Sequence, residues 1–174
     1  MIYGTAVYPG TFDPITLGHL NVVERVSKLF ERLIIGVGVN PEKRHWFTPE
    51  ERVDLIRKST AHLPNIEVVI YEGLTVRFVE QCHSKIMVRG VRPITDIPAE
   101  LTMMMANRQL APDIETLFLI ADGELAHVSS SLIKEIVPVA DAQVLRAFLP
   151  EPVIVAVQKR AKTSESKTLE KQDG

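Results

Sequence analysis

Residues 5–30 constrain the fold more than any other stretch of the chain. An apolar run, Ala6-Val7-Tyr8, ends in a turn rich in proline and glycine that spans residues 9–14. Apolar residues then return at spacings of three and four, which is the period of one face of a helix. They are Leu20, Val23, Val26 and Phe30. The pattern predicts a strand, a tight turn and a helix.

The turn before this helix is the predicted place for a ligand. In parallel α/β sheets, ligands bind where strands end and helices begin, because the first helical N–H groups lack intrahelical partners and the helix dipole is positive there. We therefore expect an anion, and above all a phosphate. The turn matches neither Gly-x-x-x-x-Gly-Lys-Ser/Thr nor Gly-x-Gly-x-x-Gly, so those two phosphate-binding motifs are excluded. His19 lies in the first helical turn, and Gly18 before it leaves room for a ligand at the backbone.

Strands and helices alternate along the rest of the chain. An unalternated apolar run at residues 33–39 is typical of a strand buried on both faces, and further strands are predicted at 66–71, 86–88 and 115–120. Thr48-Pro49-Glu50-Glu51 predicts a helix start, since Thr48 and Glu51 can form a capping box around Pro49. Other helices are predicted at 75–82, from the cap Asp96 to residue 110, after Ser129, after Asp141 and at 152–161.

This order of elements predicts the α/β class. We expect a Rossmann-like, doubly wound sheet of five parallel strands with helices on both faces, followed by C-terminal helices. With 174 residues, of which 45% are hydrophobic, the chain suits one domain, residues 1–161. Residues 162–174 are almost all polar or charged, which predicts a disordered tail.

Composition excludes several classes of function. The formal net charge of −2 argues against broad electrostatic binding to nucleic acid, so a few placed cations must hold an anionic ligand. The single cysteine, Cys82, excludes an internal disulfide and a cysteine-based zinc site, and it fits a reducing compartment. No signal peptide and no apolar run long enough to span a membrane is visible, so the predicted location is the cytoplasm.

Polar side chains follow each predicted strand at the point where it ends. Because parallel strands end at one edge of a sheet, these side chains should gather there. They are Thr11 and His19 after the first strand, Lys43 after the second, Thr75 after the third, Arg89 and Arg92 after the fourth, and residues 127–131 after the fifth. Simpler interpretations remain open, because Lys43 could be solvated and Arg92 could pair with Asp96 or Glu100. Met103, Met104 and Met105 suit either the core or a subunit interface.

Several motifs together resemble a known family. Residues 8–14 with Thr16-Leu17-Gly18-His19 resemble nucleotidyltransferases of the T/H-x-G-H type, and within them the phosphopantetheine adenylyltransferase family. The likeness covers about residues 2–161 and includes Lys43 before Phe-Thr-x-Glu-Glu-Arg, Arg89-Gly90-Val91-Arg92, Asn107-Arg108 and the serine-rich stretch 129–135. The sequence departs from the family pattern in two places: family members often have an aromatic residue just before the acid that corresponds to Glu100, where this chain has Pro98-Ala99, and Thr75 stands where a larger apolar residue is common.

The resemblance implies adenylyl transfer from ATP to 4′-phosphopantetheine, giving dephospho-CoA and pyrophosphate in coenzyme A biosynthesis. Carried over residue by residue, it implies that Thr11, Lys43, Thr75 and Arg89 bind phosphopantetheine. The implied catalytic residues are His19, as the transition-state stabiliser, Lys43 and Arg92. The implied ATP-binding residues are Thr11, Phe12, His19, Gly90, Val91, Arg92, Glu100, Leu125, Ala126, His127, Val128, Ser129, Ser130 and Ser131.

The resemblance also implies partners and alternatives. We expect Mg²⁺ held mainly by substrate oxygens and water, a homo-hexamer, and feedback by CoA. A second enzyme class is adenylyl or cytidylyl transfer to nicotinate mononucleotide or a phosphorylated alcohol, although Ser129 to Lys134 does not match the Arg-Thr-x-Gly-Ile-Ser-Thr segment usual in cytidylyltransferases. A nucleotide-binding module without turnover would lack His19 or the cations, and this chain has them all.

Overall fold

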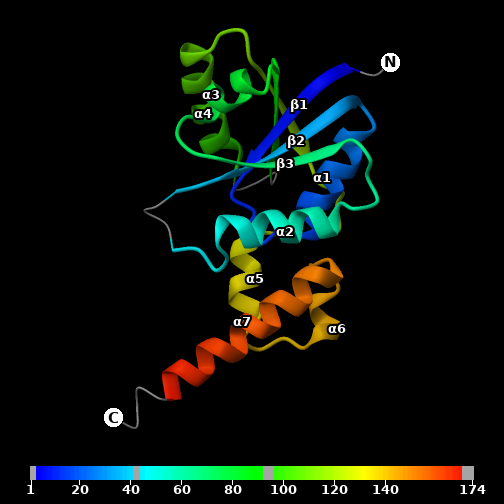
Figure 1. Ribbon diagram of the computed structural model, residues 1–174, viewed down its shortest axis with the longest axis vertical. Helices are drawn as coiled ribbons and strands as arrows, with labels where there is room; N and C mark the ends of the chain where they lie inside the picture. The colour runs from blue at the N-terminus through cyan, green and yellow to red at the C-terminus, as the bar shows by residue number, and fades with distance from the viewer. Residues whose placement is uncertain (1–2, 41–43, 92–95, 170–174) are drawn as a thin grey trace.

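A five-stranded parallel sheet forms the centre of the protein (Figure 1). The computed structural model describes residues 3–40, 44–91 and 96–169, with the backbone alone at residue 3 and residues 162–169. The strands are β1 (Tyr3–Gly10), β2 (Phe30–Gly38), β3 (Ile66–Tyr71), β4 (Ile86–Val91) and β5 (Glu115–Ile120). Their order is β3-β2-β1-β4-β5 and each neighbouring pair is parallel. The order reverses between β1 and β4, where open α/β sheets bind ligands.

Helices cover both faces of the sheet. They are α1 (Leu17–Ser27), α2 (Pro49–Ser59), α3 (Thr75–Gln81), α4 (Ile97–Leu110), α5 (Ser130–Ile136), α6 (Ala142–Leu145) and α7 (Glu151–Leu169). Helices α3 and α4 lie on one side, α1 and α2 lie on the other, and α5, α6 and α7 follow below α2 (Figure 1). The predicted α/β class and the doubly wound, Rossmann-like sheet are confirmed.

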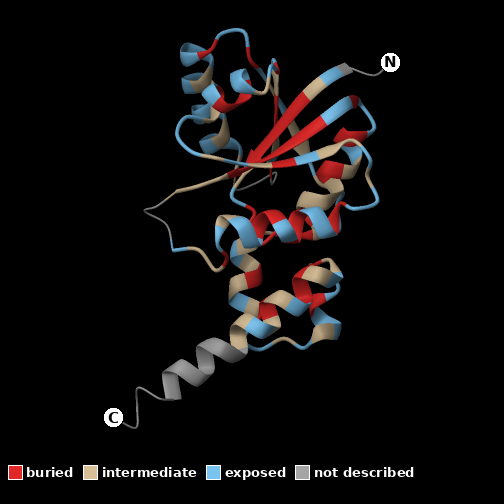
Figure 2. Ribbon diagram, in the orientation of Figure 1, coloured by how far each residue is buried: buried red, intermediate tan, exposed pale blue. Residues whose placement is uncertain are grey.

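Two apolar clusters hold these layers together. Successive side chains of a strand point to opposite faces, so Ala6 and Tyr8 join the cluster under α1 and α2, whereas Val7 joins the cluster under α3. Ile35 and Ile34 of β2 divide in the same way. Figure 2 shows the buried residues concentrated in the central strands and on the inner sides of α1 and α2. Burial on both faces explains the unalternated apolar runs in the sequence.

Side-chain caps start most of the predicted helices where the sequence places them. Thr48 accepts a hydrogen bond from the Glu51 N–H, and the Glu51 carboxylate accepts one from the Thr48 N–H, so the predicted capping box of α2 is confirmed. Ser129 caps α5 and Asp141 caps α6, also as predicted. Asp96 stands at the N-cap position of α4, but its side chain makes no capping hydrogen bond to the helix.

Two predictions about elements differ from the structure. Phe30 was assigned to the first helix, but α1 ends at Ser27 and Phe30 is the first residue of β2. The apolar spacing continues across the boundary, and no glycine or proline marks the helix end, so spacing alone could not separate the two elements. The last helix, predicted to end at residue 161, runs to Leu169. The polar residues at 162–169 predict that this segment does not pack against the core, but they do not prevent it from forming a helix. Residues 170–174 of the predicted tail lie outside the described part of the chain.

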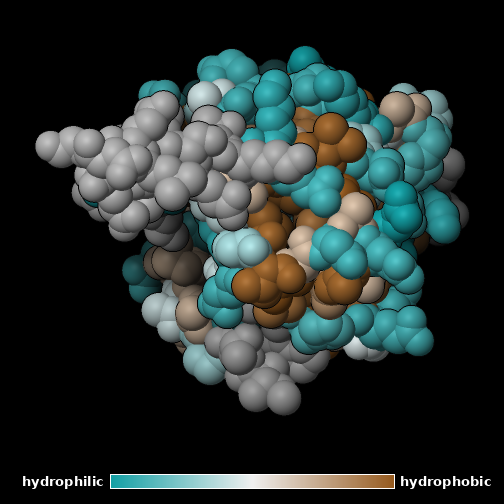
Figure 3. Space-filling model, turned by 90° about the horizontal axis from the view of Figure 1, so that it is seen from below, coloured by the Kyte–Doolittle hydropathy of each residue, from teal (hydrophilic) through white to brown (hydrophobic). Residues whose placement is uncertain are grey.

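Several apolar side chains are exposed, and those of α4 stand out because they lie together on one helix. No residue of α4 is buried, and Leu101, Met103, Met105 and Leu110 are all exposed, so Met103 and Met105 do not belong to the core of this chain. Val155 of α7 is also exposed. Viewed from below, the molecule shows apolar surface near the middle of the face, bordered by hydrophilic residues (Figure 3). No helix in the described part of the chain is both long and apolar enough to cross a membrane.

Candidate active site

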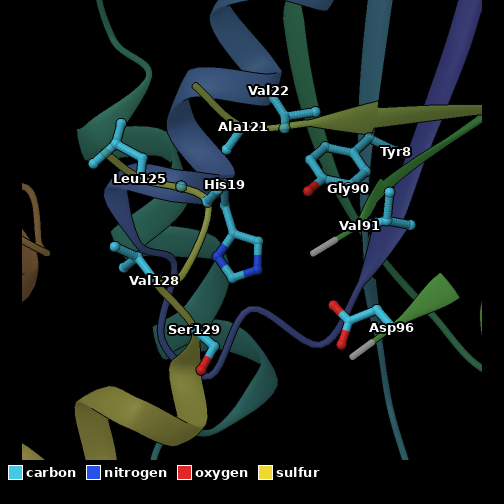
Figure 4. A pocket seen from close by; sticks show the side chains of 12 residues that line it. Tyr8, His19, Val22, Gly90, Val91, Asp96, Ala121, Leu125, Val128 and Ser129 are labelled. Atoms are coloured by element: carbon cyan, nitrogen blue, oxygen red, sulfur yellow. The ribbon is translucent and has the colours of Figure 1, made fainter. Parts of the chain in front are cut away.

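A cavity of about 130 Å³ lies beside the carboxyl ends of β1, β4 and β5. Its lining joins the start of α1, the end of β4 and the segment between β5 and α5; the residues are Tyr8, Gly18, His19, Val22, Gly90, Val91, Asp96, Ala121, Leu125, Ala126, Val128 and Ser129. Figure 4 shows the imidazole of His19 among these side chains, with Tyr8 and Asp96 on one side and Val128 and Ser129 on the other. Seven residues predicted to bind ATP meet here: His19, Gly90, Val91, Leu125, Ala126, Val128 and Ser129.

His19 is held in the first turn of α1 by a capping box with Thr16. The Thr16 N–H donates to His19 Nδ1 at 3.1 Å, and the His19 N–H donates to Thr16 Oγ1 at 3.4 Å. A backbone N–H can only donate, so Nδ1 is the acceptor and the neutral ring carries its hydrogen on Nε2. The sequence therefore builds an oriented Nε2–H donor at this helix start, which is the form that a phosphate oxygen can use.

Phe12 supports His19 from behind. Its ring is buried and meets the imidazole edge to face, with ring centroids 5.2 Å apart, and it meets Tyr8 in the same way at 5.3 Å. Phe12 has a backbone φ of 49°, which is uncommon for a residue with a side chain and often marks functional turns. The Asp13–Pro14 peptide bond that follows is cis. A contact of Phe12 with ATP must therefore come from its backbone.

Tyr8 and Gly90 shape the wall between β1 and β4. A Cβ atom on Gly90 would lie 2.6 Å from the Tyr8 hydroxyl oxygen, so any larger residue at this position would displace the Tyr8 side chain. Burial raises the pKa of Tyr8 above its ordinary value, against the opposing effect of the nearby Arg89 charge. The phenol therefore stays neutral and can donate a hydrogen bond at this wall.

Gly18 has a different role from the predicted one. A Cβ atom there would lie 3.1 Å from the carbonyl oxygen of Leu125 and 3.2 Å from that of Val128. The space beside Gly18 is thus filled by the segment between β5 and α5. The N–H of Leu17 donates to the Phe148 carbonyl, so this amide of the helix start is also used within the protein. Gly18 brings α1 and that segment together around His19.

The serine-rich start of α5 is tied to the first turn. Ser129 Oγ accepts the Leu132 N–H at 3.1 Å as the helix cap, and Ser130 Oγ donates to the Pro14 carbonyl at 2.8 Å. Ser131 is exposed, and His127 is exposed with its ring against Phe148. Of the residues predicted from this stretch, Ser129 lines the cavity, whereas His127, Ser130 and Ser131 do not.

A second, smaller cavity lies on the other side of β4. It is lined by Thr75, Met87, Arg89, Glu100, Met103, Met104, Asn107 and Thr116. Arg89 donates from Nε and Nη2 to the two carboxylate oxygens of Glu100, at 2.8 and 2.6 Å, and from Nη1 to the Pro9 carbonyl at 3.0 Å. Burial would lower the pKa of Arg89, but the hydrogen bonds and charge of Glu100 outweigh it and raise that pKa. Thr75 also points to this cavity and exchanges a hydrogen bond with the Tyr71 hydroxyl.

The structure thus divides the predicted residues between two neighbouring cavities. Thr75 and Arg89, predicted for phosphopantetheine, share the second cavity. Glu100, predicted for ATP, lies there with Arg89 and not in the His19 cavity. Thr11 is exposed at the end of β1. Lys43 and Arg92 lie outside the described residues, so the predictions for them stand as they were made.

Sequence reasoning missed three residues of the site. The sequence assigns Tyr8 to an apolar strand and the turn motif, and Asp96 to a helix cap or an ion pair with Arg92, but it names neither as a binding residue, although both line the His19 cavity. Asp13 was read as part of the turn. It is buried, accepts the Trp46 and Phe47 N–H groups at 2.9 Å, and pairs with Lys134 of α5. For Asp96 the available signal was its place after β4, at the predicted ligand-binding edge.

The fold and a histidine at the first helix start define the class of protein, a nucleotidyltransferase. Residues 7–136 match the cytidylyltransferase-like family. A Vibrio parahaemolyticus structure described as a "Putative Nicotinate-nucleotide Adenylyltransferase" superposes with a TM-score of 0.66 over 90% of this chain and 99% of that one, at 14% identity, which shows the fold alone.

Closer relatives identify the particular family. A phosphopantetheine adenylyltransferase of Rhodopirellula baltica is 51% identical over 157 residues, which are 90% of this chain and 88% of the relative. One from Synechococcus sp. is 47% identical over 155 residues, which are 89% of this chain and 96% of the relative. The chain belongs to the phosphopantetheine adenylyltransferase family.

Proposed function

We propose that this enzyme transfers the adenylyl group of ATP to 4′-phosphopantetheine, giving dephospho-CoA and pyrophosphate in coenzyme A biosynthesis. The observation that carries the proposal is the oriented His19 imidazole, which lies in a cavity where the strand order reverses between β1 and β4. A second cavity beside it contains Arg89. Family membership supports the choice of substrates, since the relatives are named for this activity.

The phosphate of 4′-phosphopantetheine is the nucleophile in this reaction. A phosphomonoester has its second pKa near about 6, so at neutral pH the attacking phosphate is already mostly a dianion. The reaction needs no general base, and catalysis consists of alignment and charge stabilisation. The Nε2–H of His19 is the group placed to donate to the α-phosphate as charge develops on it. As predicted from the sequence, Lys43 and Arg92 would add positive charge to the phosphates.

Each cavity suits one of the two substrates. We place ATP at the His19 cavity, where Gly90, Val91 and Leu125 offer apolar walls and backbone polar groups. The phosphate of phosphopantetheine fits near Arg89, because a guanidinium matches phosphate geometry, and Thr75 lies in the same cavity. The substrates then meet at the ends of β1 and β4.

We propose that Mg²⁺ accompanies ATP. In the described part of the chain, no group of three or more His, Cys, Asp or Glu side chains could hold a metal ion, whereas the Asp96 carboxylate lines the His19 cavity. These residues suit an ion held mainly by phosphate oxygens and water, with Asp96 at most an outer partner. The ion would neutralise part of the triphosphate charge.

Three further proposals concern the whole protein. The exposed apolar side chains of α4 support an assembly of several copies of the chain, since such surfaces are commonly covered in an assembly, and the family resemblance makes a homo-hexamer the proposed assembly. Feedback by CoA is chemically reasonable, because CoA contains the same phosphopantetheine arm as the substrate. It would compete with the substrate for the second cavity, which contains Arg89. A single cysteine supports a location in the reducing cytoplasm.

Pyrophosphate release from ATP tests the proposed activity. The assay is run separately with 4′-phosphopantetheine, nicotinate mononucleotide and glycerol phosphate, and dephospho-CoA is identified as the second product. We expect turnover with phosphopantetheine and none above background with the other two. Turnover with either of the others instead would overturn the assignment of substrate, and binding of ATP without pyrophosphate release would point to a binding module.

A further inference from the structure

Arg52 of α2 is a fully buried arginine beside the ends of two strands. Its exposed fraction is 0%. Nη1 donates to the Thr11 carbonyl at 2.8 Å and to the Gly38 carbonyl at 3.2 Å, and Nε donates to the Thr48 carbonyl at 3.4 Å. One guanidinium therefore joins the turn after β1, the end of β2 and the start of α2.

This arrangement is poorly explained by stability alone. Burial lowers the pKa of Arg52 against the opposing charges of Asp13 and Glu50, so the position disfavours the charged form. Nη2 is buried and has no hydrogen-bond partner among the described residues. A buried charge that is only partly satisfied generally contributes less to stability than well-packed apolar atoms of the same volume. A contribution to the active site is the alternative reason for this residue.

The peptide that Arg52 holds lies directly behind the site. The Thr11 carbonyl belongs to the peptide unit whose N–H is that of Phe12. In a trans peptide the C=O and N–H point in opposite directions, so a carbonyl turned toward the buried guanidinium turns the Phe12 N–H away from the interior. Phe12 has a positive φ, and its ring packs against His19, so this peptide and the imidazole are positioned together.

We propose that Arg52 is a positioning residue for adenylyl transfer, which orients the Thr11–Phe12 peptide so that its N–H donates to the ATP phosphates beside His19. Arg52 itself touches neither substrate. The proposal rests on the proposed function. It also gives the turn after β1 a donor for phosphate, whereas the Leu17 and His19 amides at the start of α1 already have partners within the protein.

Two variants of Arg52 test the proposal. Arg52→Met keeps the apolar stem and removes every donor, and Arg52→Lys keeps a charge and some donors. We expect kcat to fall at least tenfold in Arg52→Met, with the Kd for ATP changed less than threefold, because the amide contact tightens in the transition state. Arg52→Lys should lower kcat more than twofold but less than Arg52→Met does, because one ammonium group cannot reproduce donors on two guanidinium nitrogens. Both kcat values are corrected for the folded fraction measured by circular dichroism.

Arg57→Met is the matched control on the same helix. Arg57 also donates from its guanidinium to a carbonyl, that of Val68 at 3.1 Å, but at the edge strand β3. We expect its kcat to stay within twofold of the wild type.

Each other outcome is decisive. The proposal is overturned if Arg52→Lys keeps kcat within twofold of the wild type, whether or not Arg52→Met folds, or if Arg57→Met loses as much activity as Arg52→Met. It is also overturned if the loss disappears after correction for folding. A wild-type chain that makes no dephospho-CoA overturns the proposed function itself, whereas an active wild type with unaffected Arg52 variants overturns the role of Arg52 alone.

Discussion

The two nitrogens of His19 have separate tasks. Thr16 uses Nδ1 as a hydrogen-bond acceptor, and this bond orients the ring and leaves the hydrogen on Nε2. In a usual capping box a glutamate or glutamine plays the part of His19, and its side chain is spent on the cap. Because an imidazole has a second nitrogen, this helix start can combine a structural cap with a donor for substrate.

Replacing His19 should therefore affect the chemical step more than binding. We expect His19→Ala to lower kcat by about 10²–10³, the usual cost of losing one oxyanion donor, while the Kd for ATP changes little. Steady-state kinetics and ATP titration calorimetry measure the two quantities. His62→Ala is the control, since His62 is exposed and pairs with Glu24. A His19→Ala variant whose only defect is a higher KM for ATP contradicts the role of transition-state stabiliser.

Arg89 depends on the geometry of its side chain as well as on its charge. Arg89→Lys keeps the charge but cannot reach both Glu100 oxygens and the Pro9 carbonyl together. We expect the KM for phosphopantetheine to rise at least tenfold and the KM for ATP to change less than threefold. Arg32→Lys is the control, because Arg32 also donates from Nε and Nη2 to a glutamate but on the exposed surface. A larger change in the KM for ATP would place Arg89 with the other substrate.

At the scale of elements, Asp13 joins segments that are distant in the sequence. Its carboxylate binds the amides of Trp46 and Phe47, just before α2, and Lys134 of α5. Burial would raise the pKa of Asp13, but the hydrogen bonds from Lys134, Trp46 and Phe47 outweigh it and hold that pKa below its ordinary value. One side chain thus positions the turn that carries Phe12 relative to α2 and α5.

Loss of this charge should destabilise the protein. We expect Asp13→Asn to lower the free energy of unfolding by about 3 kcal/mol, as when a buried ion pair is broken, measured by denaturant unfolding at pH 7. Asp54→Asn is the control, because Asp54 makes an exposed ion pair with Lys58 and should change stability little. Equal effects of the two substitutions would contradict the structural role of Asp13.

The lowered pKa of Asp13 fixes how the stability of the protein depends on pH. A carboxyl group whose pKa is lowered by folding adds stability above its unfolded pKa of about 3.9 and loses that contribution as the pH falls through the lowered value. The difference in stability between wild type and Asp13→Asn should therefore be constant from neutral pH to about pH 5 and shrink below about pH 4. A difference that shrinks between pH 7 and pH 5 would contradict this assignment.

Local signals in the sequence determined which elements could be predicted. The strands β3 and β5 have the predicted bounds, and the caps Thr48, Ser129 and Asp141 stand where they were predicted, because a cap or a short apolar run is read from adjacent residues. Contacts between distant residues could not be read in this way. Asp13 and Lys134 are 121 positions apart, and the split of Arg89 and His19 between two cavities depends on which face of β4 each side chain meets.

At the scale of the whole molecule, family resemblance and geometry support each other. The resemblance named His19, Gly90 and Leu125 as residues of one site, and the fold brings them to one cavity from three separate segments. Spacing alone indicated a common sheet edge but not which residues share a cavity. For the apolar residues of α4 the sequence alone could not decide between the core and a subunit interface. The structure excludes the core, because no residue of that helix is buried.

This exposed helix gives the last prediction, which concerns assembly. If α4 contacts a second copy of the chain, a charge placed in its apolar surface must be desolvated on association and should weaken the assembly. Light scattering of the wild type should give about six times the 19.5 kDa mass of one chain, and Met105→Glu should give a smaller mass. Val155→Glu on α7 is the matched control, because Met105 and Val155 have similar exposed fractions of 65% and 62%. Each substitution places the same charge on an equally exposed apolar position. An unchanged mass for Met105→Glu together with a reduced mass for Val155→Glu would therefore assign the interface to the C-terminal helices and not to α4.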